Sequence, residues 1–162
     1  MISVNEAINT LLAGSHRLVE TETVPLGSAL GRTLAADLVS PLDVPPADNS
    51  AMDGYAFRHA DWPGPESELP IGLRITAGTA PGELAPGMAA RIFTGAEVPQ
   101  GADTVVMQEN CEGTDTTVRI LELPARGANI RPRGQDVKLG QTVLRAGQRL
   151  RPQEVGLAAS LG

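Results

Sequence analysis

Hydrophobic and polar positions follow a helical spacing near both ends of the chain and a strand-like spacing between them. Near the N-terminus, apolar residues recur three and four positions apart, at Val4, Ala7, Ile8, Leu11 and Leu12. Ser3 and Glu6 form a capping-box pattern before this stripe, and Gly14 is suited to end the helix. The pattern predicts a helix over residues 3–13 with one apolar face.

A second helix is predicted at the C-terminus. Pro152 suits the first helical position, and Glu154 lies near the positive end of the helix dipole. The apolar run then stops at the end of the chain, and the stripe of the first helix has no partner nearby in sequence. We therefore expect a fragment of a longer protein, the alternative being that the two terminal helices pack on each other.

The middle of the chain predicts short strands. Segments rich in Val, Ile, Thr or Arg, separated by Gly- and Pro-containing turns, cover residues 71–77, 89–94, 104–108 and 116–121. Short strands at this spacing favour a small barrel or sandwich. The Gly- and Pro-rich segments between them are therefore predicted to be turns of one β-rich lobe.

Weaker patterns predict further elements around this lobe. Residues 18–24 and 36–40 suggest short strands, and residues 27–34 a short helix. Residues 142–144 and 149–151 suggest the two arms of a hairpin. The whole is expected to be α+β and mostly β.

The composition is that of a globular domain with an aliphatic core. Hydrophobic residues make up 41% and charged residues 20%, whereas aromatic residues make up only 2%. The formal net charge of −6 argues against nucleic-acid or anionic-membrane binding, which needs a positive surface. An anionic substrate would have to be held by local arginines, by backbone N–H groups or through a metal ion.

The single cysteine and the N-terminal sequence indicate in which cellular compartment the protein is expected. Cys111 is the only cysteine, so the chain can form neither an internal disulfide nor a cysteine-based metal site. The N-terminus lacks the basic region and apolar run of a signal peptide, and no stretch has the roughly 20 apolar residues of a membrane span. These features favour a cytoplasmic protein.

The segment over residues 45–56 is the leading candidate for a functional loop. It combines Pro, Asp, Asn and Gly with two apolar side chains, Met52 and Tyr55, which is typical of an ordered loop. Asp53 precedes Gly54, whose missing side chain leaves room for close approach to the backbone. Asp53 is therefore the first candidate for a catalytic or metal-associated carboxylate, the alternative being an aspartate that caps a turn.

Three blocks of the chain resemble the molybdenum-insertase (molybdopterin molybdenumtransferase) family. They are DNSAMDGYA at 48–56, RIFTGAEVPQGADTVVMQE at 91–109 and NIRPRGQD at 129–136. Their order and spacing are those of the family, and the resemblance covers essentially the whole chain. One departure is Gln135, at a position that is often Glu.

The resemblance implies an elongated multidomain protein of which this chain holds the first parts. A β-rich lobe over residues 46–137 would be inserted into a linking domain over residues 15–45 and 138–162. The helix within residues 1–14 would pack on a large α/β domain that follows in the family and is absent here.

The resemblance also implies an activity and partners. The family inserts molybdate into adenylylated molybdopterin, with release of AMP and a requirement for Mg²⁺. Its active site resembles a cleft between two subunits of a homodimer, and molybdopterin adenylyltransferase supplies the substrate. Neither nucleic acid nor a membrane is expected to take part, and this chain alone is expected to be inactive.

Site residues follow from the matched blocks. Asp53, Thr94 and Asp136 are the expected catalytic residues, with Asp53 and Asp136 as the metal ligands. The expected cofactor-binding residues are Ser50, Gly95, Arg131 and Arg133. Local alternatives exist for two of these positions, because Thr94 suits a strand-end backbone bond and Asp136 suits a surface salt bridge to a neighbouring arginine.

Two other functions compete with this interpretation. A non-catalytic dimerisation or scaffold module is the main rival, since relatives of the family serve as scaffolds. A generic carbohydrate- or nucleotide-binding β domain is the weaker rival, because it does not explain why three separate blocks match.

Overall fold

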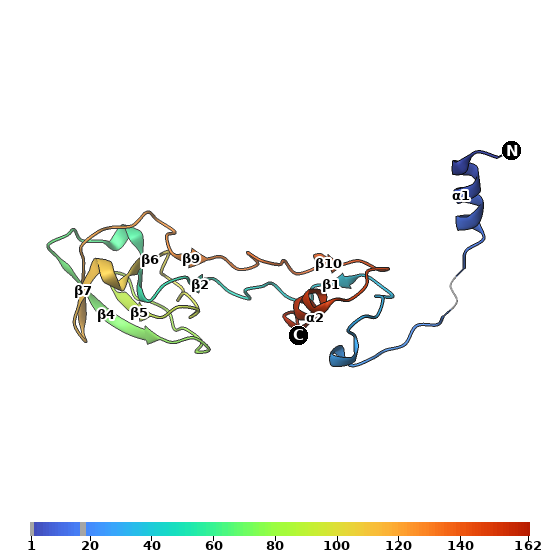
Figure 1. Cartoon of the computed structure of the whole chain (residues 1–162). Helices are drawn as coiled ribbons and strands as arrows, with labels where there is room; N and C mark the ends of the chain where they lie inside the picture. Colours follow the sequence, from blue (N-terminus) through green and yellow to red (C-terminus); the bar gives the residue numbers. More distant parts are fainter. Residues whose placement is uncertain (1, 17–18) are drawn as a thin grey trace. The chain divides into compact units, whose positions relative to one another are not determined.

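The computed structural model describes residues 2–16 and 19–162 of the 162-residue chain. The chain forms two compact units (Figure 1). One comprises the described residues of Met1–Asp37 with Leu144–Ser160 and Gly162, and the other comprises Leu38–Val143 with Leu161. Strands dominate the described part and two α-helices are found there, so the expected α+β, mostly β class is confirmed.

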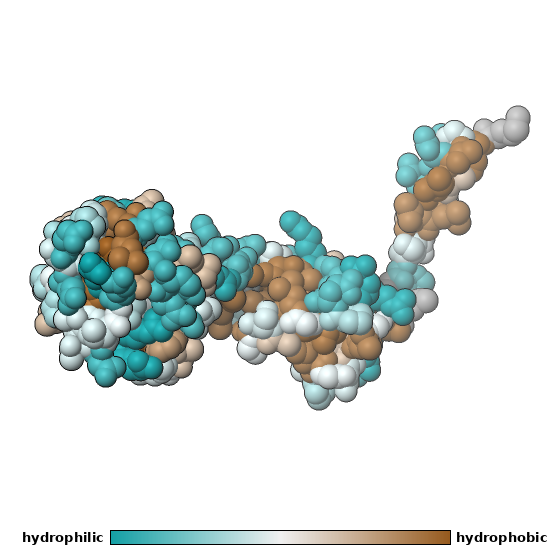
Figure 2. All heavy atoms as spheres, turned by 60° about the vertical axis from the view of Figure 1, so that its left-hand side comes forward, coloured by the Kyte–Doolittle hydropathy of each residue, from teal (hydrophilic) through white to brown (hydrophobic). Residues whose placement is uncertain are grey.

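Helix α1 (Val4–Ala13) begins and ends where the sequence predicts. The Ser3 hydroxyl accepts the N–H of Glu6 at 3.2 Å, and the Glu6 carboxylate accepts the N–H of Ser3 at 2.7 Å. This reciprocal pair satisfies two N–H groups that have no partner inside the helix. The apolar stripe is exposed, with Val4 and Leu11 each at 76%, and Figure 2 shows hydrophobic atoms along the helix.

Helix α2 (Pro152–Ala159) confirms the predicted C-terminal helix. Pro152 occupies the first turn, and the Glu154 carboxylate accepts the backbone N–H of Arg151 at 2.9 Å and its Nη2 at 2.5 Å. Glu154 is buried, so its charge depends on these contacts. The guanidinium of Arg151 holds the pKa of Glu154 below its usual value, at about 2. Helix α2 lies against the short 3-10 helix η1 (Leu26–Ser28).

This ion pair predicts an acid-dependent loss of stability. A carboxylate with a lowered pKa stabilises the fold above the pKa it has when unfolded, near 4.5, and loses that contribution as the pH falls towards 2. We expect Glu154→Gln to remove this part of the pH dependence, as measured by thermal melts between pH 7 and pH 2. Glu122→Gln is the matched control, and an identical pH profile for Glu154→Gln and the unchanged chain would contradict the assignment.

A six-stranded sheet forms the main body of the second unit (Figure 1). Its strands are β3 (Gly54–Phe57), β4 (Glu68–Ile75), β5 (Ala89–Ile92), β6 (Thr104–Met107), β7 (Cys111–Gly113) and β8 (Thr117–Ile120). The order is β6-β3-β5-β4-β8-β7, and β4 and β5 are parallel whereas the other pairs are antiparallel. The four predicted strands are confirmed as β4, β5, β6 and β8, with ends that differ by at most three residues.

The sheet curls, and it buries side chains on both of its faces. Gly113 lies in the edge strand β7, yet a side chain there would overlap the hydroxyl of Tyr55 in the distant strand β3. Tyr55 and Phe57 pack with Val106 on one face of the sheet. On the other face Ala56 packs with a second apolar cluster that includes Ile92, Val105 and Ile75. The aromatic side chains of β3 therefore pack in the core, as large rings usually do.

Two antiparallel chain segments form a narrow two-stranded ribbon. Strand β2 (Asn49–Ser50) pairs with β9 (Ile130–Arg131), and β1 (Leu38–Val39) pairs with β10 (Thr142–Leu144). The hairpin predicted between residues 142–144 and 149–151 is therefore wrong. Residues 148–150 instead pair with residues 31–34. The N–H of Leu150 donates to the carbonyl of Arg32, and the N–H of Leu34 donates to the carbonyl of Gln148.

Two further predictions are corrected or bounded. Of the strand predicted over residues 18–24, Leu18 lies outside the described residues and residues 19–24 form no strand. The helix predicted over residues 27–34 is only the single turn η1, because Gly31 has a positive φ of 80° and Thr33 forms a β-bridge. Two more 3-10 turns, η2 (His59–Asp61) and η3 (Gln108–Asn110), were not predicted. No helix in the described ranges combines the length and apolar character needed to cross a membrane.

Candidate functional site

Asp53 and Thr94 meet although 41 residues separate them in sequence. The Asp53 Oδ1 atom accepts the backbone N–H and the hydroxyl of Thr94, each at 2.7 Å. Asp53 lies between β2 and β3, and Thr94 lies in the turn after β5. Oδ2 of Asp53 takes no hydrogen bond from the described residues, so one carboxylate oxygen is open to a ligand.

Ser50 and Gly95 hold these two segments together through the backbone. The N–H of Gly95 donates to the carbonyl of Ser50, and the N–H of Ser50 donates to the carbonyl of Ala96, each at 2.8 Å. Gly95 has a φ of 80°, which the turn requires and which a glycine adopts without strain. The buried Ser50 hydroxyl donates to the carbonyl of Met52 at 2.6 Å. These contacts position Asp53, and a direct role of Ser50 or Gly95 in binding stays a prediction.

The hydrogen bonds from Thr94 lower the pKa of Asp53. The hydroxyl contributes most and the backbone N–H next, with a further contribution from the positive charge of Arg91. Because each of these groups favours the ionised carboxylate, Asp53 is charged at neutral pH.

We expect Thr94→Val to raise the pKa of Asp53. Valine removes the hydroxyl donor and leaves the backbone N–H, so the pKa should move part of the way back towards its usual value. Titration of the Asp53 carboxyl carbon by NMR measures this shift. Thr79→Val is the control, since it alters an exposed threonine whose hydrogen bonds within the described ranges go to Thr76. An unchanged Asp53 titration in Thr94→Val would show that the hydroxyl contact does not form.

Arg131 and Asp136 form a second pair at the start and end of one turn. Arg131 Nη2 donates to Asp136 Oδ2 at 2.7 Å, and both side chains are about half exposed, at 47%. Arg131 lies opposite Asn49 in the β2–β9 ladder. The structure therefore brings the 129–136 block beside the 48–56 block. The salt bridge itself contributes little to stability at this exposure.

Arg133 is held by two aspartates on the opposite segment. Its Nε donates to Asp43 Oδ2 at 2.6 Å, and its backbone N–H donates to Asp48 Oδ1 at 2.7 Å. The N–H of Leu139 and the Arg133 side chain lower the pKa of Asp43. Arg133 also lines a pocket of about 660 Å³ together with Asp48, Glu83 and Glu97. These contacts fix the shape of the 129–136 loop against residues 43–48.

The Asp53–Thr94 pair and the Arg131–Asp136 pair supply few protein ligands for a metal ion. Within residues 2–16 and 19–162, no three His, Cys, Asp or Glu side chains gather as a metal site, and no hydrogen bond joins the Asp53–Thr94 pair to the Arg131–Asp136 pair. Mg²⁺ is nevertheless often held by one or two carboxylates, with water and substrate phosphate as the other ligands. The open Oδ2 of Asp53 fits that arrangement, whereas Asp136 Oδ2 is bonded to Arg131.

Arg91 is a functional candidate that the sequence reasoning did not single out. Its Nη1 donates to the carbonyl of Gly54 at 3.0 Å and its Nη2 donates to Gln108 Oε1 at 2.6 Å. Because Gly54 follows Asp53 directly, Arg91 braces the strand that carries the carboxylate. The sequence feature that could have pointed to Arg91 is its place in the 91–109 block, three residues before Thr94.

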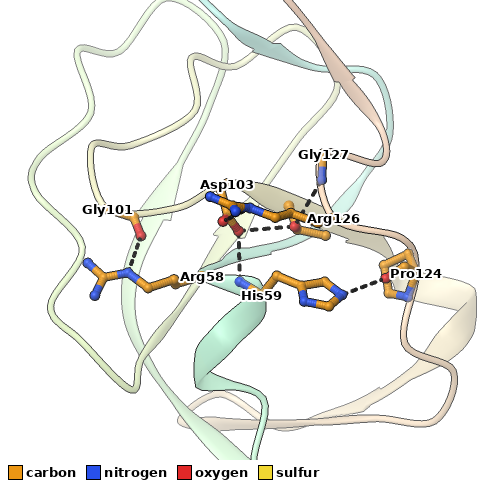
Figure 3. A network of polar contacts seen from close by, with 8 residues as sticks. Arg58, His59, Gly101, Asp103, Pro124, Arg126 and Gly127 are labelled. Atoms are coloured by element: carbon orange, nitrogen blue, oxygen red, sulfur yellow. Dashed lines mark hydrogen bonds and ion pairs between the residues drawn. The ribbon is translucent and has the colours of Figure 1, made fainter.

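Asp103 is the centre of a polar network that was also missed (Figure 3). Its carboxylate accepts the N–H of His59 at 2.7 Å and Arg126 Nε at 2.7 Å. Partial burial opposes ionisation, but these bonds and one from the Thr104 hydroxyl outweigh it and lower the pKa of Asp103. Arg58 donates to the carbonyl of Gly101 at 3.3 Å beside them. The network ties η2 to the loops on either side of it and so is primarily structural.

Cys111 is not a candidate nucleophile. Burial raises the pKa of its thiol to about 11, and the thiol donates to the Met107 carbonyl at 3.4 Å. A thiol in that state is protonated at neutral pH and unreactive.

Comparisons with known proteins agree with one another. Residues 2–162 match the model of the MoeA N-terminal region (domain I and II). The chain is 43% identical over 157 residues to molybdopterin molybdenumtransferase 2 of Mycobacterium tuberculosis, covering 94% of this chain and 39% of that protein. It is 40% identical over 164 residues to the molybdopterin molybdenumtransferase of Haemophilus influenzae, covering 100% of this chain and 40% of that protein.

Solved structures give the same likeness. A molybdopterin biosynthesis MoeA protein from Pyrococcus horikoshii has a TM-score of 0.85 and 40% sequence identity, covering 98% of this chain and 43% of that one. A second structure of such a protein has a TM-score of 0.86 at 30% identity. The chain thus spans about 40% of the length of the curated relatives it matches.

Proposed function

This chain belongs to the family of the MoeA N-terminal region, domains I and II, and we propose that it is the N-terminal part of a molybdopterin molybdenumtransferase. Such an enzyme inserts molybdate into adenylylated molybdopterin and releases AMP in molybdenum-cofactor biosynthesis. The observation that carries the proposal is the double contact between Asp53 and Thr94, which joins two of the three family blocks at one carboxylate.

Asp53 is the central residue of the proposed site. Its ionised carboxylate would be one ligand of a Mg²⁺ ion, which would supply positive charge to the substrate phosphate and its leaving group. Thr94 fixes the orientation of that carboxylate. Arg131 and Arg133 are proposed to contact anionic oxygens of the substrate, since a guanidinium pairs with such oxygens in a bidentate manner. Asp136 orients Arg131 through their ion pair.

The rest of the site is proposed to come from outside this chain. Residues 46–137 would form one wall of a cleft in a cytoplasmic homodimer, and residues 15–45 with 138–162 would link it to the following domain. The exposed stripe on α1, with Val4, Ile8 and Leu11, is suited to pack on that domain. Upstream, molybdopterin adenylyltransferase would supply the activated pterin.

A chimera tests the proposal in cells. Residues 2–162 would replace the matching segment of the M. tuberculosis relative, and the chimera would be expressed in bacteria that lack their own molybdenumtransferase. We expect the chimera to restore the activity of a molybdenum-dependent enzyme, and the 162-residue chain alone to leave it absent. A well-expressed chimera without activity, or restoration by the chain alone, would contradict the proposal.

A further inference from the structure

Beside the Asp53 loop, the curled sheet forms a pocket of about 500 Å³ that the proposed function does not use. Its lining includes two arginines, Arg74 and Arg91, and the aromatic residue Tyr55. One carboxylate, Asp115, also lines it and forms no ion pair with either arginine. The pocket therefore has a locally positive lining in a chain whose net charge is −6.

Strand register places the three side chains next to one another. Arg74 of β4 lies opposite Arg91 of β5, and Arg91 lies opposite Tyr55 of β3. Residues in register on neighbouring strands project from the same face of a sheet. The guanidinium carbons of Arg74 and Arg91 lie 4.9 Å and 4.7 Å from the centre of the Phe93 ring, and that of Arg91 lies 5.0 Å from the Tyr55 ring.

Strand β7 closes the pocket at Gly113. A side chain at this position would overlap the Tyr55 hydroxyl, so only glycine allows the β7 edge to come this close. Neither the Tyr55 hydroxyl nor the Arg74 guanidinium makes a hydrogen bond to any residue of the described ranges, so both can donate to a ligand.

Among the described residues, neither arginine of this pocket forms an ion pair, although the charge of Arg91 also acts on Asp53. The Arg91 side chain donates to two neutral acceptors, the Gly54 carbonyl and Gln108 Oε1, and the Arg74 side chain contacts the Phe93 ring. Like charges in register on adjacent strands repel, and a bound anion would relieve this repulsion. Two guanidinium groups and a phenol hydroxyl that line the same pocket are donors suited to a tetrahedral oxyanion.

We propose that Arg74, Arg91 and Tyr55 form an oxyanion subsite for a phosphate group or for molybdate. The pocket adjoins the candidate site, because Arg91 also binds the carbonyl of Gly54, the residue after Asp53. The assignment of the anion to the substrates of molybdenum insertion rests on the proposed function. The binding of a tetrahedral oxyanion itself does not.

Titration of the 162-residue chain with inorganic phosphate and, separately, with molybdate at neutral pH tests this subsite. We expect saturable NMR shifts at the Nε–H groups of Arg74 and Arg91 and at the Gly113 amide, with a dissociation constant in the millimolar range or tighter. Arg74→Gln should weaken binding about tenfold, which corresponds to one charge-assisted hydrogen bond. Arg145→Gln is the control for the same loss of charge, since its exposed side chain lies outside the pocket.

The outcomes separate the two anion sources and the two proposals. Saturation by phosphate alone indicates a substrate phosphate, and saturation by molybdate alone indicates the metal oxyanion; either supports the subsite. No saturation with either anion overturns it, as does equal weakening in Arg74→Gln and Arg145→Gln. The side chain of Arg74 forms no hydrogen bond with a described residue, so its variant is expected to fold even if Arg91→Gln does not. Anion binding with an inactive chimera would refute the proposed function and leave the subsite standing.

Discussion

Replacing Asp53 by asparagine is expected to lower molybdenum insertion by the chimera at least about 100-fold. Asparagine keeps the shape of the side chain, and its oxygen can still accept the two hydrogen bonds from Thr94. Only the negative charge is lost, and with it the ability to hold a divalent cation at the open oxygen. The rate of AMP release, measured with adenylylated molybdopterin and molybdate, reports the loss.

A matched control separates this effect from a general change of charge. Asp61→Asn also removes one negative charge, and its oxygen can still accept the N–H of Gly87. We expect that variant to keep its rate within about twofold, as do most surface substitutions away from a site. Sedimentation then distinguishes the rival scaffold function. If Asp53→Asn retains full activity but loses its oligomeric state, Asp53 belongs to an assembly surface and not to a catalytic site.

Gly54→Ala is expected to destabilise the second unit by more than about 3 kcal/mol, above the usual range for an overpacked core. Gly54 begins β3 between β5 and β6, and a side chain there would overlap the carbonyl oxygen of Val106. That oxygen belongs to the backbone of β6, which pairs with β3 along its whole length, so it cannot move without breaking this ladder. Because Asp53 precedes Gly54, the variant should also lose the Asp53–Thr94 contact.

Denaturant unfolding at neutral pH measures this effect. Gly82→Ala is the control, because a side chain at Gly82 would meet only Leu73, at an ordinary 3.8 Å. We expect the control to change the free energy of unfolding by less than about 0.5 kcal/mol. Equal stability of Gly54→Ala and Gly82→Ala would mean that β3 does not pair with β6 in this register.

Local signals predicted the helices and most of the sheet. The Ser3–Glu6 capping box and Pro152 act within a single turn of helix, so their residues alone determine where α1 and α2 begin. Strands β4, β5, β6 and β8 each lie in a segment rich in Val, Ile, Thr or Arg between turn residues, which is long enough to show a pattern. Strands of two residues, such as β2 and β9, are too short to show any pattern.

The sequence pattern could not predict which distant segments pair with each other. Residues 142–144 looked like one arm of a hairpin because a turn follows them, and that turn does form between Arg145 and Gln148. The two arms nevertheless pair with residues 38–39 and 31–34, which lie more than 100 positions earlier. Periodicity identifies a strand but does not identify its partner.

The candidate site was predicted through its motif blocks and completed by the structure. Asp53 and Thr94 were named separately, and their direct contact follows from the β3–β5 pairing that brings the two blocks together. Arg91 and Arg74 were not named. Their importance arises from cross-strand neighbours and from stacking on Phe93, neither of which is visible in the order of residues.

The most direct measurement is the yield of AMP and of molybdenum-bound pterin from the purified chimera. With adenylylated molybdopterin, molybdate and Mg²⁺, we expect AMP to be released in step with molybdenum insertion, and both to be lost together in Asp53→Asn. Insertion at an unchanged rate in Asp53→Asn, or no insertion by a folded chimera, would contradict the role of this chain as a wall of the insertion site.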